Sequence, residues 1–329
     1  MKHAIVGLAA LATLNSTGAM AQDDPLKIGA ALYGLRAEFA QIMVEAMEAH
    51  PAVLSGKVDL TVYDGRYDAL VQQDQFEIMI TQEFDGILFF PIDVDAGAAA
   101  VQEAYDAGIP VVAANARVNS DLLTAYIGSN DVEAGYIEAK SVLDEIGCKG
   151  DVVVIEGPIG QSAQIQRLEG NLQALAECPD VTVLERQSAN WSRAEAQTLM
   201  ENWLTAHPGQ IEGVIGQNDE MALGAIEAIK GAKLSTDDFA VAGIDGVTDA
   251  LNAVKADEMS TTLQDGASQA LGALDIVINA AMGGGYTPES GIWETYPAMD
   301  WAGGTAGEYT VPWTPVTESN VDQLLEMRN

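Results

Sequence analysis

The sequence is short of basic residues. Lys and Arg together number 15 against 49 Asp and Glu, which gives a formal net charge of -34. Such a surface repels phosphate backbones and anionic lipid, so binding to nucleic acid or to a membrane surface is disfavoured. The carboxylates are scattered along the chain, which favours a role in solubility over an acidic interaction tail.

Long apolar runs are also missing after the first residues. The stretch from Ala4 to Leu14 follows Met1-Lys2-His3 and precedes Ala19-Met20-Ala21. This arrangement predicts a secretory signal peptide over residues 1–21. No later segment approaches the roughly 20 apolar residues of a membrane span. No Cys follows the run, which disfavours a lipid anchor, so we expect a soluble protein in a bacterial periplasm.

Cysteine and histidine are scarce. Cys148 and Cys178 are the two cysteines, and each precedes one of two expected neighbouring parallel strands. An oxidising compartment favours a disulfide between them, with two unpaired thiols as the alternative. Beyond the leader the histidines are His50 and His207, each directly before a proline, where a capping or turn role is favoured over catalysis.

Signatures of catalysis are absent. The chain contains no G-x-S-x-G elbow, no phosphate-cradling G-x-x-x-x-G-K-S/T, no G-x-G-x-x-G and no His and Cys at metal-ligand spacing. The sequence therefore predicts no catalytic residue, no metal and no cofactor. A binding protein is favoured over an enzyme.

A repeated alternation of strands and helices is present instead. Short apolar strands between helices are typical of a parallel sheet covered on both faces, and roughly 300 residues usually form two domains. Strands are expected at 27–32, 58–63, 86–90, 109–114, 125–128, 151–156, 181–186, 213–216, 239–244 and 262–263. Helices are expected at 38–49, 67–83, 96–107, 131–146, 162–177, 193–206, 219–230, 267–282 and 320–327. The segment 286–306 either covers a domain or lies over a cleft.

The stretch from Ile211 to Ile229 reads as a strand, a polar turn and a helix. Its turn places Asn218 at the carboxyl end of a parallel strand, where ligands usually meet such sheets. Asp219 is expected to cap the following helix, while Met221, Leu223 and Ile226 are expected in the core.

The segment QNDEMALGA within this stretch resembles periplasmic sugar-binding proteins of the ribose-binding type, the receptors of ABC importers. Further motifs keep the family's order and spacing over nearly the whole mature chain: Ile109-Pro110-Val111-Val112, Ile127 to Asp131, Arg167-x-x-Gly170, Leu204 to Pro208, Gly243 to Gly246 and Pro315 to Asp322.

The resemblance implies a periplasmic binding protein-like I fold, which is an α/β fold. Two Rossmann-like lobes with parallel sheets are expected, joined by a three-strand hinge near Ser129, Asp265 and Pro312. The expected N-terminal lobe is 22–129 plus 266–311, and the expected C-terminal lobe is 130–265 plus 312–329.

The resemblance also places ligand contacts. Phe39 and Trp191 fall where the family stacks aromatic rings, Asn218 on its cleft amide and Asp245 on its cleft carboxylate. Such groups suit a polyhydroxy ligand, because planar polar groups engage adjacent hydroxyls and aromatic faces cover C–H surfaces. The alternatives are core positions for the aromatic residues, a helix cap for Asn218 and a turn for Asp245.

The chain departs from the family at other positions. Family members often carry Asp-Arg where this chain has Asn115-Ala116, Arg where it has Ile165, and Gln where it has Asp265. The opening turn brings larger or charged residues where shorter neutral ones are usual. We expect the site to include these positions, namely Tyr33, Arg36, Glu38, Asn115, Ile165 and Asp265. A ligand other than ribose is therefore expected, such as a linear polyol, another pentose or a hexose.

The resemblance implies a monomeric receptor that binds a monosaccharide or sugar alcohol in an interdomain cleft. It would deliver that ligand to an ABC permease in the inner membrane. A ligand-presenting protein for a chemoreceptor or sensor kinase is the alternative, because it uses the same fold. A repressor effector domain is disfavoured by the signal peptide and by the lack of a basic DNA-binding head.

Overall fold

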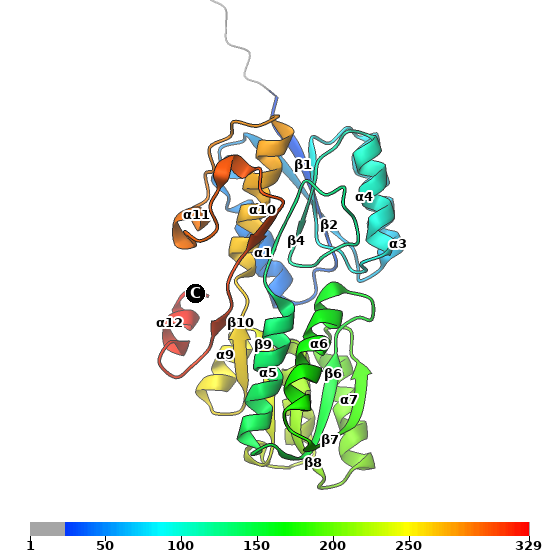
Figure 1. Ribbon diagram of the computed structural model, residues 1–329, viewed down its shortest axis with the longest axis vertical. Coiled ribbons are helices and arrows are strands. Elements are labelled where there is room, and N and C mark those ends of the chain that lie inside the picture. Colours follow the sequence, from blue (N-terminus) through cyan, green and yellow to red (C-terminus); the bar gives the residue numbers. More distant parts are fainter. Residues whose placement is uncertain (1–23, 329) are drawn as a thin grey trace, which may run out of the picture.

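Two lobes, each built on a six-stranded sheet, make up the protein (Figure 1). The computed structural model describes residues 24–328, so the predicted signal peptide lies outside the described residues. The sheet orders are β2-β1-β3-β4-β5-β11 and β7-β6-β8-β9-β10-β12, so the second lobe repeats the topology of the first. The predicted α/β class with two lobes is confirmed. None of the helices within residues 24–328 is long and apolar enough to cross a membrane.

The N-terminal lobe carries the first sheet, in which all strands are parallel. Strands β3, β4 and β5 are buried at every residue, as expected for apolar strands with helices on both faces. Its strands are β1 (Leu26–Leu32), β2 (Val58–Asp64), β3 (Gly86–Phe89), β4 (Val111–Ala114), β5 (Ala125–Gly128) and β11 (Glu308–Thr310). Its helices are α1 (Glu38–Glu48), α2 (Pro51–Leu54), α3 (Ala69–Thr81), α4 (Ala96–Asp106), α10 (Gly266–Ala281), α11 (Ile292–Thr295) and the short η2 (Ala302–Gly304).

The C-terminal lobe carries the second sheet, which is parallel except that β12 runs antiparallel to β10. Its strands are β6 (Lys149–Glu156), β7 (Asp180–Ser188), β8 (Ile211–Gly216), β9 (Ala240–Asp245), β10 (Ser260–Leu263) and β12 (Thr314–Pro315). Its helices are α5 (Asp131–Glu145), α6 (Ser162–Ala176), α7 (Arg193–Ala206), α8 (Asp219–Gly231), α9 (Thr248–Lys255), α12 (Val321–Glu326) and the short η1 (Thr236–Asp238). Helices α2 and α9 and strand β11 lie in segments that the sequence left unassigned.

The chain passes between the two sheets after β5, after β10 and after β11. These crossings lie side by side in the middle of the molecule (Figure 1). The Ser129 hydroxyl joins them, because it donates to the Val311 carbonyl at 2.8 Å and accepts from Gln269 Nε2 at 2.9 Å.

A disulfide joins Cys148 and Cys178. These residues stand just before the parallel neighbours β6 and β7, so the predicted pairing is confirmed. The histidines also have the predicted local roles. His50 caps α2 by accepting from the Ala52 N–H at 3.1 Å, and His207 ends α7 with its Nε2 3.0 Å from Glu185 Oε1.

The segment Tyr286 to Ala306 packs on α10 in the N-terminal lobe (Figure 1). Asp275 of α10 is fully buried and holds this segment by accepting hydrogen bonds from Trp293 Nε1 at 2.8 Å and from the Tyr286 hydroxyl at 3.1 Å. His50 Nε2 lies 3.1 Å from the same carboxylate. The sequence left open whether the segment covers a domain or lies over a cleft. The structure shows that it covers a lobe and not the cleft.

Candidate ligand-binding site

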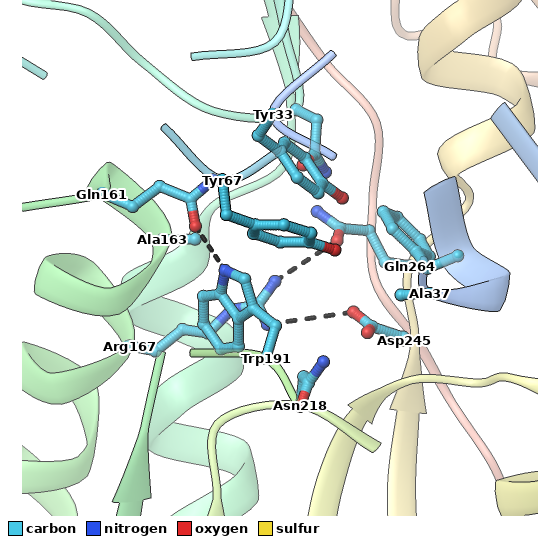
Figure 2. A pocket seen from close by; sticks show the side chains of 12 residues that line it. Tyr33, Ala37, Tyr67, Gln161, Ala163, Arg167, Trp191, Asn218, Asp245 and Gln264 are labelled. Carbon is cyan, nitrogen blue, oxygen red and sulfur yellow. Dashed lines mark hydrogen bonds and ion pairs between the residues drawn. The ribbon is translucent and has the colours of Figure 1, made fainter. Parts of the chain in front are cut away.

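A pocket lies between the lobes, at the carboxyl ends of the strands of both sheets (Figure 2). This is the edge where open α/β sheets generally bind ligands. The N-terminal lobe contributes Tyr33, Ala37, Phe39, Tyr67 and Asn115 to its lining. The C-terminal lobe contributes Gln161, Ala163, Arg167, Trp191, Asn218 and Asp245, and Gln264 joins them directly after β10.

Aromatic rings from both lobes face the pocket. Tyr33 and Tyr67 lie 5.8 Å apart between ring centroids, and Trp191 approaches from the other lobe (Figure 2). The Trp191 indole N–H donates to Gln161 Oε1, which fixes the orientation of the ring. A Cβ at Gly157 would sit 2.1 Å from the indole carbons, so the ring requires a glycine there. Such rings can cover the C–H faces of a ligand.

Arg167 is the charged centre of the pocket. Its Nε donates to Asp131 at 2.8 Å, its Nη1 to the Gln217 carbonyl at 2.6 Å and its Nη2 to Gln264 Oε1 at 3.3 Å. Burial alone lowers the pKa of Arg167, but the carboxylates of Asp131 and Asp245 outweigh it, so the pKa is raised. The guanidinium therefore stays charged and can donate to a ligand.

Asp245 presents a carboxylate to the same space. Its Oδ1 lies 3.8 Å from Arg167 Nη1 and the residue is 4% exposed. Burial raises the pKa of Asp245 well above its usual value; Arg167 lowers it, while Asp219 raises it further. A ligand hydroxyl that donates to this carboxylate stabilises its charged form.

Asn218 divides its amide between the protein and the pocket. Its Oδ1 accepts from the Met221 N–H at 3.0 Å and caps α8, while its nitrogen turns toward the space beside Trp191 and Asp245 (Figure 2). Asp219 accepts instead from the Thr261 hydroxyl at 2.6 Å and the Val247 N–H at 3.0 Å. The expectation that Asp219 caps α8 is therefore wrong. Asn218 is the extended residue before the helix, and Asp219 is already its first helical residue.

Two buried polar atoms of the lining have no hydrogen-bond partner within residues 24–328. They are the Tyr67 hydroxyl and Gln264 Nε2. Buried polar atoms are almost always paired in folded proteins, so both atoms point to a polar ligand. No group of His, Cys, Asp or Glu in the same part of the chain is placed to hold a metal ion.

Four residues of the pocket lining have a strained backbone conformation. Tyr67, Asn115, Trp191 and Asp245 have φ values of 59°, 65°, 55° and 126°, which non-glycine residues rarely adopt. All four line the pocket. Such conformations persist where the surrounding structure enforces them, and they cluster at binding sites.

Six of the residues predicted from the sequence line the pocket: Tyr33, Phe39, Asn115, Trp191, Asn218 and Asp245. The structure places the other four outside the lining. Arg36 donates to the Asn190 carbonyl and Glu38 accepts from Thr248, so both bridge the two lobes at the rim.

Ile165 and Asp265 each lie next to a residue that does line the pocket. Ile165 is 46% exposed, because it lies half a turn of α6 away from Ala163 and Arg167, which share the pocket-facing side. Asp265 caps α10 by accepting from the Ser268 N–H at 3.0 Å and also accepts from the Tyr296 hydroxyl at 2.6 Å. Gln264, one residue earlier, faces the pocket instead.

The sequence reasoning did not select six lining residues: Ala37, Tyr67, Gln161, Ala163, Arg167 and Gln264. Arg167 was visible as part of the family's Arg-x-x-Gly motif, and Gln264 is the polar residue directly before Asp265, a predicted contact. No sequence signal marked Tyr67 as a lining residue, since its place depends on the turn after β2.

The two lobes are closed over the pocket. Gln161 Nε2 donates to the Pro91 carbonyl at 3.1 Å and the Arg117 N–H donates to the Ser162 hydroxyl at 2.7 Å, both across the cleft. The cavity measures about 20 Å³, room for one or two water molecules. A larger ligand therefore requires the lobes to separate on entry and the lining side chains to move apart.

The family described as periplasmic binding protein domain matches residues 28–285. The chain is 36% identical to a xylitol-binding protein of Mycolicibacterium smegmatis, over 75% of this chain and 69% of that protein. It is also 36% identical to a putative rhizopine-binding protein of Rhizobium meliloti, over 86% of this chain and 92% of the relative.

A solved structure shares the whole architecture. The ABC transporter solute-binding protein of Bacillus halodurans with bound myo-inositol aligns with a TM-score of 0.81 and 30% identity, over 93% of this chain and 99% of that one. This similarity in fold agrees with the match to the family model and with the related sequences. This chain belongs to the family of periplasmic binding proteins, and within it to the sugar-binding proteins of the ribose-binding type.

Proposed function

We propose that this protein is a periplasmic solute receptor that binds a monosaccharide or a sugar alcohol between its lobes and delivers it to an ABC importer. The observation that carries the proposal is that aromatic rings and polar atoms without a hydrogen-bond partner line the same buried pocket. The Tyr67 hydroxyl and Gln264 Nε2 lack partners, and Trp191 and Phe39 line the same space. A relative named for xylitol and a structure holding myo-inositol support the same ligand class.

The polar groups suit a neutral ligand with several hydroxyls. Asp245 accepts from a hydroxyl, while Arg167 and the Asn218 nitrogen donate to others. Because one hydroxyl can donate and accept at the same time, a polyol satisfies both kinds of partner. The lining offers contacts for binding and no nucleophile with an adjacent base, so we propose that the protein is not an enzyme.

The remaining expectations belong to the same proposal. They are a cleaved signal peptide over 1–21, a monomeric mature protein in the periplasm, and lobes of 22–129 plus 266–311 and 130–265 plus 312–329. Ligand binding completes the pocket from both lobes, and the closed form is the state that a permease recognises.

A thermal-shift screen tests the ligand class. Myo-inositol, xylitol and D-ribose are compared with further neutral hexoses and with sugar phosphates. A ligand at about 1,000 times its dissociation constant stabilises the folded state by about 4 kcal/mol, so binders raise the unfolding midpoint. We expect at least one neutral polyol or sugar to do so and the phosphates to fail. A screen in which no neutral compound raises the midpoint contradicts the proposal.

The importer and the sensory alternative differ in a cell-based measurement. Uptake of the radiolabelled binder is compared in a strain with the gene and in a strain lacking it. Lost uptake supports delivery to an importer. Unchanged uptake with lost chemotaxis toward the same compound supports presentation to a receptor.

A further inference from the structure

Glu38 of the N-terminal lobe contacts Thr248 of the C-terminal lobe. Its Oε1 accepts from the Thr248 backbone N–H at 3.1 Å and from the Thr248 hydroxyl at 2.6 Å. Glu38 is the first residue of α1, and Thr248 is the first residue of α9. One carboxylate oxygen therefore joins the amino ends of two helices that belong to different lobes.

This contact supplies a cap that α9 otherwise lacks. The residue before the helix is Val247, whose side chain makes no capping hydrogen bond. The first N–H groups of a helix have no partner within the helix, and a carboxylate near them is favoured by the helix dipole. The carboxylate from the opposite lobe accepts from the N–H of the first helical residue, whereas Asp68 and Asn218 accept from the second or third residue of their own helices.

The contact between Glu38 and Thr248 lies where the two lobes close over the pocket. Ala37 and Phe39, on either side of Glu38 in the sequence, line the pocket from one lobe, and Asp245 lines it from the other, shortly before Thr248. Glu38 itself is not part of the lining. The hydrogen bonds with Thr248 therefore need the lobes together but do not need contact with ligand.

A second residue reaches across the same rim. Arg36 donates to the Asn190 carbonyl of the C-terminal lobe, and its guanidinium carbon lies 3.9 Å from the centre of the Tyr67 ring. Glu38 differs from it in bonding both a backbone N–H and a hydroxyl, and in capping a helix.

We propose that Glu38 is a closure latch that determines ligand affinity without touching the ligand. The apparent dissociation constant equals the intrinsic one divided by the fraction of binding-competent protein, so a contact made only in the closed form tightens binding. The inference rests on the proposed function, since it concerns the same cleft. A latch acts equally on every ligand, whereas a residue that contacts ligand discriminates between ligands.

Glu38→Ala tests the latch, with Glu45→Ala as its control. Glu45 is exposed on the same helix and the substitution removes the same charge. Titration calorimetry with myo-inositol, xylitol and D-ribose is expected to show about five-fold weaker affinity in Glu38→Ala, the factor that corresponds to about 1 kcal/mol for a lost helix cap. The same factor is expected for each compound that binds, with faster dissociation. Wild-type affinity, or factors that differ between compounds, overturns the proposal.

Thr248→Val provides a second variant from the other lobe, because it removes the hydroxyl and keeps the N–H. We expect it to weaken affinity by a smaller factor, and to add little when combined with Glu38→Ala, since both act on one contact. Fully additive factors overturn the assignment of Thr248 as the partner.

Small-angle X-ray scattering of the ligand-free protein separates the latch from the proposed function. If none of the three compounds binds wild type, the proposed function fails, and scattering alone decides the latch. A larger radius of gyration in Glu38→Ala than in wild type and Glu45→Ala then supports it. Equal radii then overturn it.

Discussion

Asn218 uses the two ends of one amide for different purposes. Its oxygen accepts from the Met221 N–H at 3.0 Å and starts α8, and its nitrogen faces the pocket (Figure 2). This one side chain therefore contributes to both stability and binding. Suitable substitutions separate the two contributions.

Asn218→Ala is expected to lose both roles. Loss of the cap lowers the free energy of unfolding by about 1 kcal/mol, and loss of the ligand contact costs about 1 to 3 kcal/mol in binding. Asn218→Ser keeps a capping oxygen, so it is expected to fold with near wild-type stability and to bind as weakly as the alanine variant. Urea unfolding and titration calorimetry measure the two effects. Wild-type binding by the serine variant contradicts the assigned contact.

Gly157→Ala is expected to weaken binding through Trp191. An added Cβ would lie 2.1 Å from the indole carbons, so the ring must move out of its place in the pocket. Affinity is expected to fall by about 1 kcal/mol or more, the size of a lost stacking contact. Gly291→Ala serves as the control, because nothing lies within 4 Å of its added Cβ. Equal affinity in the two variants, measured by calorimetry, would falsify the role of Gly157.

Asp275→Asn is expected to destabilise the N-terminal lobe by about 3 kcal/mol, because it breaks a buried network that holds the segment 286–306. Burial raises the pKa of Asp275, but hydrogen bonds from His50, Ser290 and Trp293 outweigh it and lower the pKa overall. A lowered folded pKa gives stability that is present above about pH 4 and is lost as the pH falls through the folded value.

The difference between Asp275→Asn and wild type should therefore shrink below about pH 4 in urea unfolding series. Ligand affinity is expected to stay unchanged, since Asp275 is not one of the lining residues. Asp237→Asn, at an exposed carboxylate, is the control and should leave stability as it is. A constant difference at all pH values argues against a charged Asp275.

Glu138→Gln is expected to make the free energy of unfolding less sensitive to a rise in pH. Burial raises the pKa of Glu138 to about 8, although the hydrogen bond from Asn171 lowers it. A raised folded pKa gives stability that is fully present below the unfolded value near 4.3 and is lost as the pH rises through about 8. Relative to wild type, the variant should gain stability as the pH rises from about 4.3 to about 8. Glu133→Gln on the same helix is the exposed control, and parallel profiles of all three proteins refute the prediction.

The repeated strands and helices were predictable because their signals are local. Apolar runs and helical periodicity mark β1 to β10 within a few residues of where the structure has them, with both lobes repeating one order. Helix α9 was not predicted because it has only eight residues and no capping side chain of its own. Its cap is Glu38, which lies 210 positions earlier in the chain, and no local pattern can show that.

Lining residues were predictable where the resemblance to the family assigns a ligand contact to a position in the sequence. Phe39, Trp191, Asn218 and Asp245 came from such positions and line the pocket. Tyr67 and Gln161 had no such mark, since their places follow from how the turns after β2 and β6 pack.

Three carboxylates show what the sequence determines and what only the tertiary structure determines. The sequence by itself determined the family and placed Asp219, Asp245 and Asp265 at or just after strand ends. Tertiary structure decided that Asp245 faces the pocket, that Asp219 holds the loop before α9, and that Asp265 caps α10. A carboxylate acts through the donors and charges within a few ångströms, and those neighbours come from distant parts of the chain only when it folds.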